Sequence, residues 1–249
     1  MIRSIGMTAS ALMIAAATSP AWAAVVTGDS STWEGQYHYS DGLPSANGFT
    51  AAGSTIAGAS ANYPTGWGNT LQADGLLLDN SLADGLSGQW KTAAGAFDFT
   101  AGATAEISAK VTGGGTFSAI FRIGDADEAY YFALRPELVR GLSGGSGVPF
   151  DTTDAFHTYR LAISGSAVSV YIDGSTTATY TDTTFASTAV NFLDFGDITG
   201  NASSNWVVES VRWTSEGAFA PIPEPASIAL AGLAGTLLIV RRRASRREA

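Results

Sequence analysis

The sequence predicts an all-β fold, a sandwich of two antiparallel sheets, for the large middle part of the chain. Apolar and polar residues alternate there over short stretches, which is typical of strands with one buried face. Glycine-rich turn signals separate these stretches, and no helix pattern of useful length interrupts them. Successive antiparallel strands of this kind bury their apolar faces as two stacked sheets.

The alternation of apolar and polar residues becomes regular at residue 104, where a strand is predicted to bury every second side chain. The side chains predicted to face the core are, strand by strand, Ala105, Ile107, Ala109 and Val111; Phe117, Ala119, Phe121 and Ile123; Tyr130, Phe132 and Leu134; His157, Tyr159, Leu161 and Ile163; and Val168, Val170 and Ile172. Further strands are predicted over 191–195 and 206–214. From 25 to 103 the pattern is weak, so short strands and long loops are expected there.

Two short turns are predicted within this region. Gly165-Ser166 permits a two-residue turn, and Asp173-Gly174 is typical of a type I′ hairpin, in which both central residues adopt positive φ. Residues 176–181 are predicted to return as the partner strand of this second hairpin.

The N-terminus has the features of a secretory signal helix. Arg3 precedes an apolar stretch over 5–17, and Ala21 and Ala23 place small residues where a signal peptidase reads them. Residues 1–23 are therefore predicted to be a signal peptide that signal peptidase removes.

The C-terminus, 221–249, combines three features in a fixed order. Pro223, Glu224 and Pro225 come first, and their prolines keep that segment extended. An apolar run over 226–240 follows, which as a helix would be about 22 Å long against a hydrocarbon core of about 30 Å. The cluster over 241–247 contains Arg241, Arg242, Arg243, Arg246 and Arg247. Arginines directly after a single transmembrane helix are retained on the cytoplasmic side, so the rest of the chain is predicted to lie outside the inner membrane.

This ordered tail closely resembles the PEP-CTERM sorting signal of Gram-negative bacteria, with 222–227 as the motif. The resemblance implies that a membrane-embedded exosortase recognises the tail and cleaves near the Pro-Glu-Pro. The inner membrane then holds only an intermediate, and the product reaches the cell surface or the extracellular matrix. The alternative is an ordinary single-pass anchor that happens to carry Pro-Glu-Pro.

Composition limits what the remaining domain, residues 24–220, can bind. It holds 20 of the 22 acidic residues but only 7 of the 13 basic ones, so its formal net charge is −13. Such a domain is a poor candidate for nucleic acid, which needs a basic footprint. The chain has no cysteine, so neither a disulfide nor a thiolate ligand is available.

The predicted hairpin region, with Phe156-His157-Thr158-Tyr159-Arg160-Leu161 followed by Val170-Tyr171-Ile172-Asp173-Gly174, resembles laminin-G-like and concanavalin A-like jelly rolls. The resemblance extends loosely over 104–213 and implies a two-sheet jelly roll whose relatives include lectins, glucanases and adhesion modules. Many glucanases of that superfamily carry Glu-x-Asp-x-x-Glu on one strand. That spacing is absent here, and Glu106 has no second acid at i+2.

These observations predict a non-catalytic surface or matrix protein, not an enzyme, that associates with exopolysaccharide in the biofilm matrix after exosortase processing. The alternative is a glycan-active hydrolase or lyase of the concanavalin A-like superfamily. Trp67, with neighbouring Tyr63, is the aromatic pair predicted to contact a glycan from a loop. Asp125, Asp127 and Glu128 are candidate Ca²⁺ ligands, although a solvated acidic turn is the favoured explanation; no other cofactor is predicted.

Overall fold

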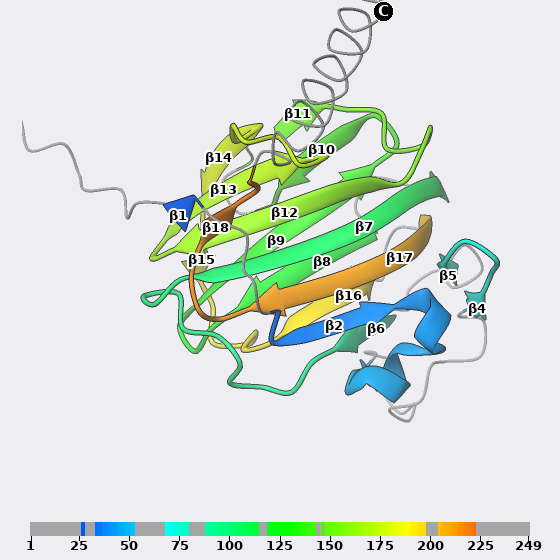
Figure 1. Cartoon of the computed structure of the whole chain (residues 1–249), viewed down its shortest axis with the longest axis horizontal. Helices are drawn as coiled ribbons and strands as arrows, with labels where there is room; N and C mark the ends of the chain where they lie inside the picture. The colour runs from blue at the N-terminus through cyan, green and yellow to red at the C-terminus, as the bar shows by residue number, and fades with distance from the viewer. Residues whose placement is uncertain are drawn as a thin grey trace, which may run out of the picture.

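A computed structural model describes residues 26–27, 33–52, 68–79, 88–114, 119–142, 145, 147–197 and 204–222 of the chain. These residues form two antiparallel sheets that stack face to face (Figure 1). The predicted all-β sandwich of two antiparallel sheets is therefore confirmed, and the architecture is consistent with a jelly roll.

We call the sheet nearer the viewer in Figure 1 the front sheet and the other the back sheet. The front sheet has the order β14 (Tyr180–Thr183), β13 (Ala167–Ile172), β12 (His157–Ser164), β7 (Ala103–Gly114), β17 (Ser204–Thr214), β5 (Leu76–Asp79) and β4 (Gly68–Leu71), and β2 (Gly35–His38) also pairs with β17. The back sheet has the order β11 (Gly147–Pro149), β10 (Leu138–Gly141), β9 (Glu128–Arg135), β8 (Ala119–Gly124), β16 (Leu193–Asp197), β6 (Gly88–Lys91) and β3 (Thr50–Ala52), and β15 (Phe185–Ala186) also pairs with β9.

Four short elements complete the described chain. Two 3₁₀ turns, η1 (Tyr39–Asp41) and η2 (Pro44–Asn47), connect β2 to β3. A two-residue parallel pairing joins β1 (Val26–Thr27) to β18 (Phe219–Ala220). This pairing brings the first and last described strands side by side over the outer face of β12 and β13, where Ala218 and Ala220 pack against Ala162 and Tyr171 (Figure 1).

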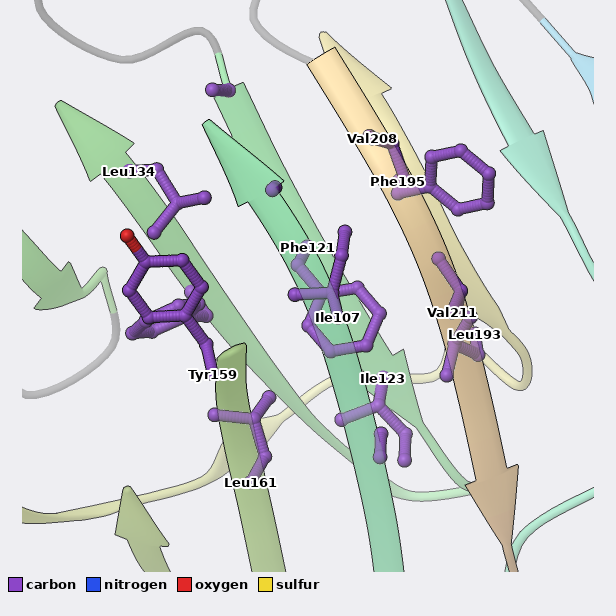
Figure 2. Close-up of a cluster of buried hydrophobic side chains, with 14 of the residues drawn as sticks. Ile107, Phe121, Ile123, Leu134, Tyr159, Leu161, Leu193, Phe195, Val208 and Val211 are labelled. Carbon is purple, nitrogen blue, oxygen red and sulfur yellow. The ribbon is translucent and has the colours of Figure 1, made fainter. Parts of the chain in front are cut away.

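The core lies between the sheets and follows the predicted alternation. Ile107, Tyr159 and Leu161 of the front sheet point toward Phe121 and Ile123 of the back sheet (Figure 2), and all five are 0% exposed. The predicted inward residues of β7, β8, β9, β12 and β13 are buried in one apolar cluster, apart from His157 and from Phe117, which lies outside the described residues. The prediction of the buried faces is therefore confirmed for these strands.

The two predicted turns form with the expected backbone. Gly165 has φ of +54°, and Ser164 pairs directly with Ala167 across the turn. Asp173 and Gly174 have φ of +52° and +69°, as a type I′ turn requires. The predicted partner strand over 176–181 is displaced, because β14 begins only at Tyr180 and pairs with the 167–170 part of β13.

His157, predicted to face the core, lies at the edge of the apolar cluster between two carboxylates. Its Nδ1 lies 2.8 Å from Asp173 Oδ2 and its Nε2 lies 2.8 Å from Asp154 Oδ1. Burial lowers the pKa of His157, but the hydrogen bonds and charges of Asp154 and Asp173 outweigh burial and raise this pKa above its usual value.

This raised pKa predicts a pH-dependent stability. The folded state binds the proton more tightly than the unfolded state, so the stabilisation is complete below about pH 6.5 and is lost as pH rises through the folded pKa. We expect the free energy of unfolding to fall by at most about 1 kcal/mol over this range, since both carboxylates are half-exposed. Urea denaturation at pH 6 and pH 8 measures the difference, and His157→Gln should abolish it. If the free energy of unfolding of this variant differs between pH 6 and pH 8 as much as that of the unaltered protein, the assignment is wrong.

Both predicted targeting segments lie outside the described residues. This applies to the signal peptide, 1–23, and to the sorting residues Pro223, Glu224, Pro225, Arg241, Arg242 and Arg243. Among the residues that are described, no helix has the length and apolar character needed to cross a bilayer.

Candidate functional site

The outer face of the front sheet contains a hollow of about 360 Å³. Strands β2, β7, β12 and β17 supply its lining, which comprises Gln36, Tyr37, His38, Glu106, Ser108, Thr158, Glu209, Ser210, Val211 and Arg212. Ligand sites in proteins usually enclose roughly 300–1,000 Å³, so this hollow has the size of a small ligand site.

Glu106 reaches the hollow because β7 alternates. Its neighbours Ala105 and Ile107 are both buried in the core, so the side chain between them points to the outer face. In the register of the sheet, Glu106 lies opposite Arg160 of β12 and Arg212 of β17. The carboxylate therefore sits in the middle of a row of three charged residues.

Both arginines in this row bind the Glu106 carboxylate. Arg160 Nε donates to Oε2 at 2.7 Å, and Arg212 donates to Oε1 through Nε at 2.7 Å and Nη2 at 2.6 Å. The Trp33 ring lies over the two guanidinium groups, at 4.4 Å from Arg212 and 5.4 Å from Arg160. These contacts present Glu106 to the hollow as an anchored carboxylate whose side chain is only 9% exposed.

Glu209 reaches the same hollow through a β-bulge in β17. The pairing with β7 shifts register between Val208 and Ser210, which leaves Glu209 as the extra residue. Val208 and Val211 are both fully buried, so the bulge restores the inward direction after an interval of three residues. Bulges of this kind redirect a side chain, and here the redirected side chain is a carboxylate.

The surroundings of Glu209 differ from those of Glu106. Ser108 Oγ donates to Glu209 Oε2 at 2.6 Å, and among the described residues no cation lies within ion-pair distance of this carboxylate. Ser108 follows Glu106 by two positions, which is about 7 Å along a strand. The hollow thus holds two carboxylates, one paired with arginines and the other bonded to a hydroxyl.

Two carboxyl groups flanking one sugar linkage are what most glycoside hydrolases use, at separations between about 5 and 9.5 Å. Glu106 has no second acid at i+2 on its own strand, whereas Glu209 lies on the neighbouring strand β17. One sequence signal of the bulge at Glu209 is the spacing of the apolar residues around it. The interval is two residues between Trp206 and Val208 but three between Val208 and Val211.

The predicted glycan-binding aromatics, Tyr63 and Trp67, lie outside the described residues. The predicted calcium ligands are described, and hydrogen bonds within the fold use Asp125 and Glu128. Asp125 accepts from the backbone N–H groups of Asp127, Glu128 and Phe99, whereas Glu128 accepts from the Thr184 hydroxyl.

Asp125 therefore caps the turn between β8 and β9. In the part of the chain that the structure describes, no three His, Cys, Asp or Glu residues are grouped so that they could hold a metal ion. Calcium binding by Asp125, Asp127 and Glu128 stays a prediction.

Comparison with known proteins places the fold. The sequence matches no protein-family model and no curated protein. Among solved structures, the chain is similar to a carbohydrate esterase from the Shiga toxin-encoding bacteriophage phi24B, with 18% identity and a TM-score of 0.53 over 73% of this chain and 97% of that one. It is also similar to domain 4 of AbnA, a GH43 extracellular arabinanase from Geobacillus stearothermophilus in complex with arabinotriose (16% identity, TM-score 0.49, 76% and 95% covered).

A beta-1,3-glucanase from Mycobacterium marinum gives a further match, with 12% identity and a TM-score of 0.46 over 74% of this chain and 99% of that one. At such low identities these likenesses show the fold alone.

The prediction of a non-catalytic matrix protein is contradicted by this set of neighbours. One of them, with a TM-score of 0.53, is a carbohydrate esterase, a protein that acts on carbohydrate. The physical reason for the error is that the absence of a carboxylate pair along one strand says nothing about pairs formed between strands.

Proposed function

We propose that the domain is a glycan-active enzyme of the concanavalin A-like superfamily, a glycoside hydrolase that works in the front-sheet hollow. The observation that carries this proposal is the meeting of Glu106 and Glu209 in one hollow with unlike hydrogen-bond partners. Unlike environments are what allow two carboxyl groups to take the separate roles of acid and anion.

Glu209 is the proton donor in this proposal. Its protonated form gives a proton to the glycosidic oxygen as the bond from that oxygen to the sugar carbon breaks. The anchored carboxylate of Glu106 faces the positive charge that develops on the sugar carbon. Water then adds to that carbon, and the proton that water loses returns to Glu209, so the enzyme is restored.

The neighbouring side chains would position these two groups. Ser108 orients Glu209 through its 2.6 Å hydrogen bond, and Arg160 and Arg212 hold Glu106 from opposite sides. Three adjacent strands supply all five side chains, so the site stands on rigid elements.

Delivery to the cell surface is the second part of the proposal. The ordered Pro-Glu-Pro motif, apolar run and arginine cluster support processing of the tail by an exosortase, and the N-terminal signal supports export. Mass spectrometry of the mature protein tests this part, because a product that ends near Glu224 is expected. A chain that still carries Arg247 and stays in the inner membrane would contradict it.

Glu209→Gln tests the hydrolase. We expect the rate of reducing-end release from the exopolysaccharide of the producing cells to fall by about 10²–10⁴-fold, because an amide N–H is not acidic enough to protonate the glycosidic oxygen. The melting temperature should stay unchanged, since Ser108 can still bond to the amide oxygen. Glu137→Gln removes the same charge from an exposed turn between β9 and β10 and serves as the matched control.

Full activity in the Glu209→Gln variant would show that this carboxyl group is not the acid. Absence of reducing-end release by the unaltered protein, together with binding of the polysaccharide, would overturn the proposal of an enzyme.

A further inference from the structure

The few basic residues of this acidic domain are concentrated on the outer face of the back sheet. Four of its seven basic residues lie on the back-sheet strands β6, β8, β9 and β10, namely Lys91, Arg122, Arg135 and Arg140. Each follows or precedes a core residue on its strand, so each points away from the core. On the described strands of this face, Asp194 is the acidic residue that points the same way.

Four polar residues on this face form one row across four strands. Lys91 of β6 lies opposite Asp194 of β16, Asp194 lies opposite Arg122 of β8, and Arg122 lies opposite Tyr131 of β9. Gln89, two positions before Lys91, shares this outer face. We call these five residues the back-sheet row.

Arg122 organises the back-sheet row. Its Nε donates to both oxygens of Asp194, at 2.9 and 3.1 Å, and its Nη2 donates to Asp194 as well. Nη1 donates to the Tyr131 hydroxyl at 3.3 Å, and Nη2 donates to Gln89 Oε1 at 3.2 Å. Arg122 is therefore a positioning residue whose guanidinium fixes the side chains on either side.

These bonds determine which groups remain to bind a ligand. A guanidinium can only donate, so it occupies an acceptor site of the Tyr131 oxygen and of the Gln89 amide oxygen. The Tyr131 O–H and the Gln89 NH₂ are left to donate, and Lys91 adds an ammonium group that lies over the same Phe192 ring as the Arg122 guanidinium. A group of donors that includes a cation suits an anionic oxygen ligand.

Aromatic rings frame the same donors. Phe192 lies under Lys91 at 5.1 Å and under Arg122 at 5.4 Å, and Tyr131 lies 5.1 Å from Arg122. Phe185 packs edge-on against Tyr131, with ring centroids 4.9 Å apart. Half-buried rings beside fixed donors are suited to the apolar face of a sugar ring.

We infer that the back-sheet row binds an acidic glycan, with the carboxylate of a uronic acid unit held by Lys91, Tyr131 and Gln89. A uronic acid chain carries one charge per sugar, which this small set of cations can match. A nucleic acid would require a much broader basic surface than a domain of net charge −13 provides. The row lies on the sheet opposite the front-sheet hollow, so the inference does not depend on the proposed hydrolysis.

Binding of polygalacturonate by the full chain tests this inference, with fully methyl-esterified polygalacturonate as the neutral ligand of the same backbone. We expect calorimetry to show binding of the acidic form that weakens with salt, and at least 10-fold weaker binding of the ester. Lys91→Met should weaken binding of the acidic form by about 10-fold, and Tyr131→Phe by about 5-fold, because each removes one donor.

Lys110→Met is the matched control. Lys110 is the other lysine of the domain, lies on the front-sheet strand β7 and also stacks on a ring, at 5.9 Å from Phe156. We expect this variant to bind polygalacturonate as the unaltered protein does. Equal affinity for the acid and the ester, no binding of either, or equal losses in Lys91→Met and Lys110→Met would each overturn the inference.

Discussion

Replacing Asp194 by alanine will destabilise the domain by about 3–5 kcal/mol, because it leaves the buried guanidinium of Arg122 without its counter-charge. Asp194 is 0% exposed and the Arg122 side chain is 11% exposed, so solvent cannot replace the lost partner. Burial raises the pKa of Asp194, while the hydrogen bonds and charge of the Arg122 guanidinium lower it. Arg122 therefore stabilises the buried carboxylate. Urea denaturation should report the loss, and thermal denaturation should show a fall in melting temperature of roughly 6–20 °C.

The double variant Arg122→Met with Asp194→Leu separates stability from binding. Replacing both partners of a buried ion pair by apolar residues of similar volume is often neutral or stabilising, so most of the lost stability should return. Polygalacturonate binding should be weakened in the double variant, because Tyr131 and Gln89 lose the guanidinium that orients them. A single variant with less than about 1 kcal/mol of destabilisation would mean that Arg122 finds another partner.

The fold could be predicted after residue 104 because its strands are long and apolar side chains recur at every second position. In β7, β8 and β9 these side chains form the face that packs in the core between the sheets. The turn at Asp173 could be predicted because few residue pairs tolerate positive φ at two successive positions. Local pattern and local geometry were enough in both cases.

The strands among the first hundred residues could not be predicted in the same way. Their strands β2, β5 and β6 have four residues each, too few for a period of two to stand out. Each is stabilised by pairing with a distant strand, as β2 is with the C-terminal half of β17 and β6 is with β16. Pairing partners so far apart in the chain are not visible in a single sequence.

The front-sheet hollow was missed for a related reason. Ser108 and Glu209, which share a hydrogen bond, are 101 positions apart, and a bulge interrupts the regular alternation of β17 at Glu209. The back-sheet row likewise combines β6, β8, β9 and β16, whose order in the sheet differs from their order in the chain. The sequence was therefore enough to assign side chains of the long strands to one face or the other. Which of these side chains lie together in one site depends on the order of the strands in the sheet.

Glu106→Ala will lower both the activity and the free energy of unfolding, whereas Glu209→Gln will lower the activity alone. The Arg160 side chain is 7% exposed and loses a buried partner, for which a cost of about 3 kcal/mol is expected. Arg212 is 38% exposed, so solvent screens its share of the loss and its contribution is at most about 1 kcal/mol. Activity should fall by at least 10²-fold, because no other described carboxylate lines the hollow opposite Glu209.

The comparison of these two variants decides what the hollow is for. If Glu106 and Glu209 act as a catalytic pair, both variants lose reducing-end release, but only Glu106→Ala has a lowered melting temperature. If the Arg160, Glu106 and Arg212 row serves only to hold β12, β7 and β17 together, Glu209→Gln keeps full activity and the loss in Glu106→Ala follows its unfolding curve. Measuring rates well below the melting temperature of each variant separates these outcomes, because a folded but inactive Glu106→Ala protein is compatible only with the catalytic pair.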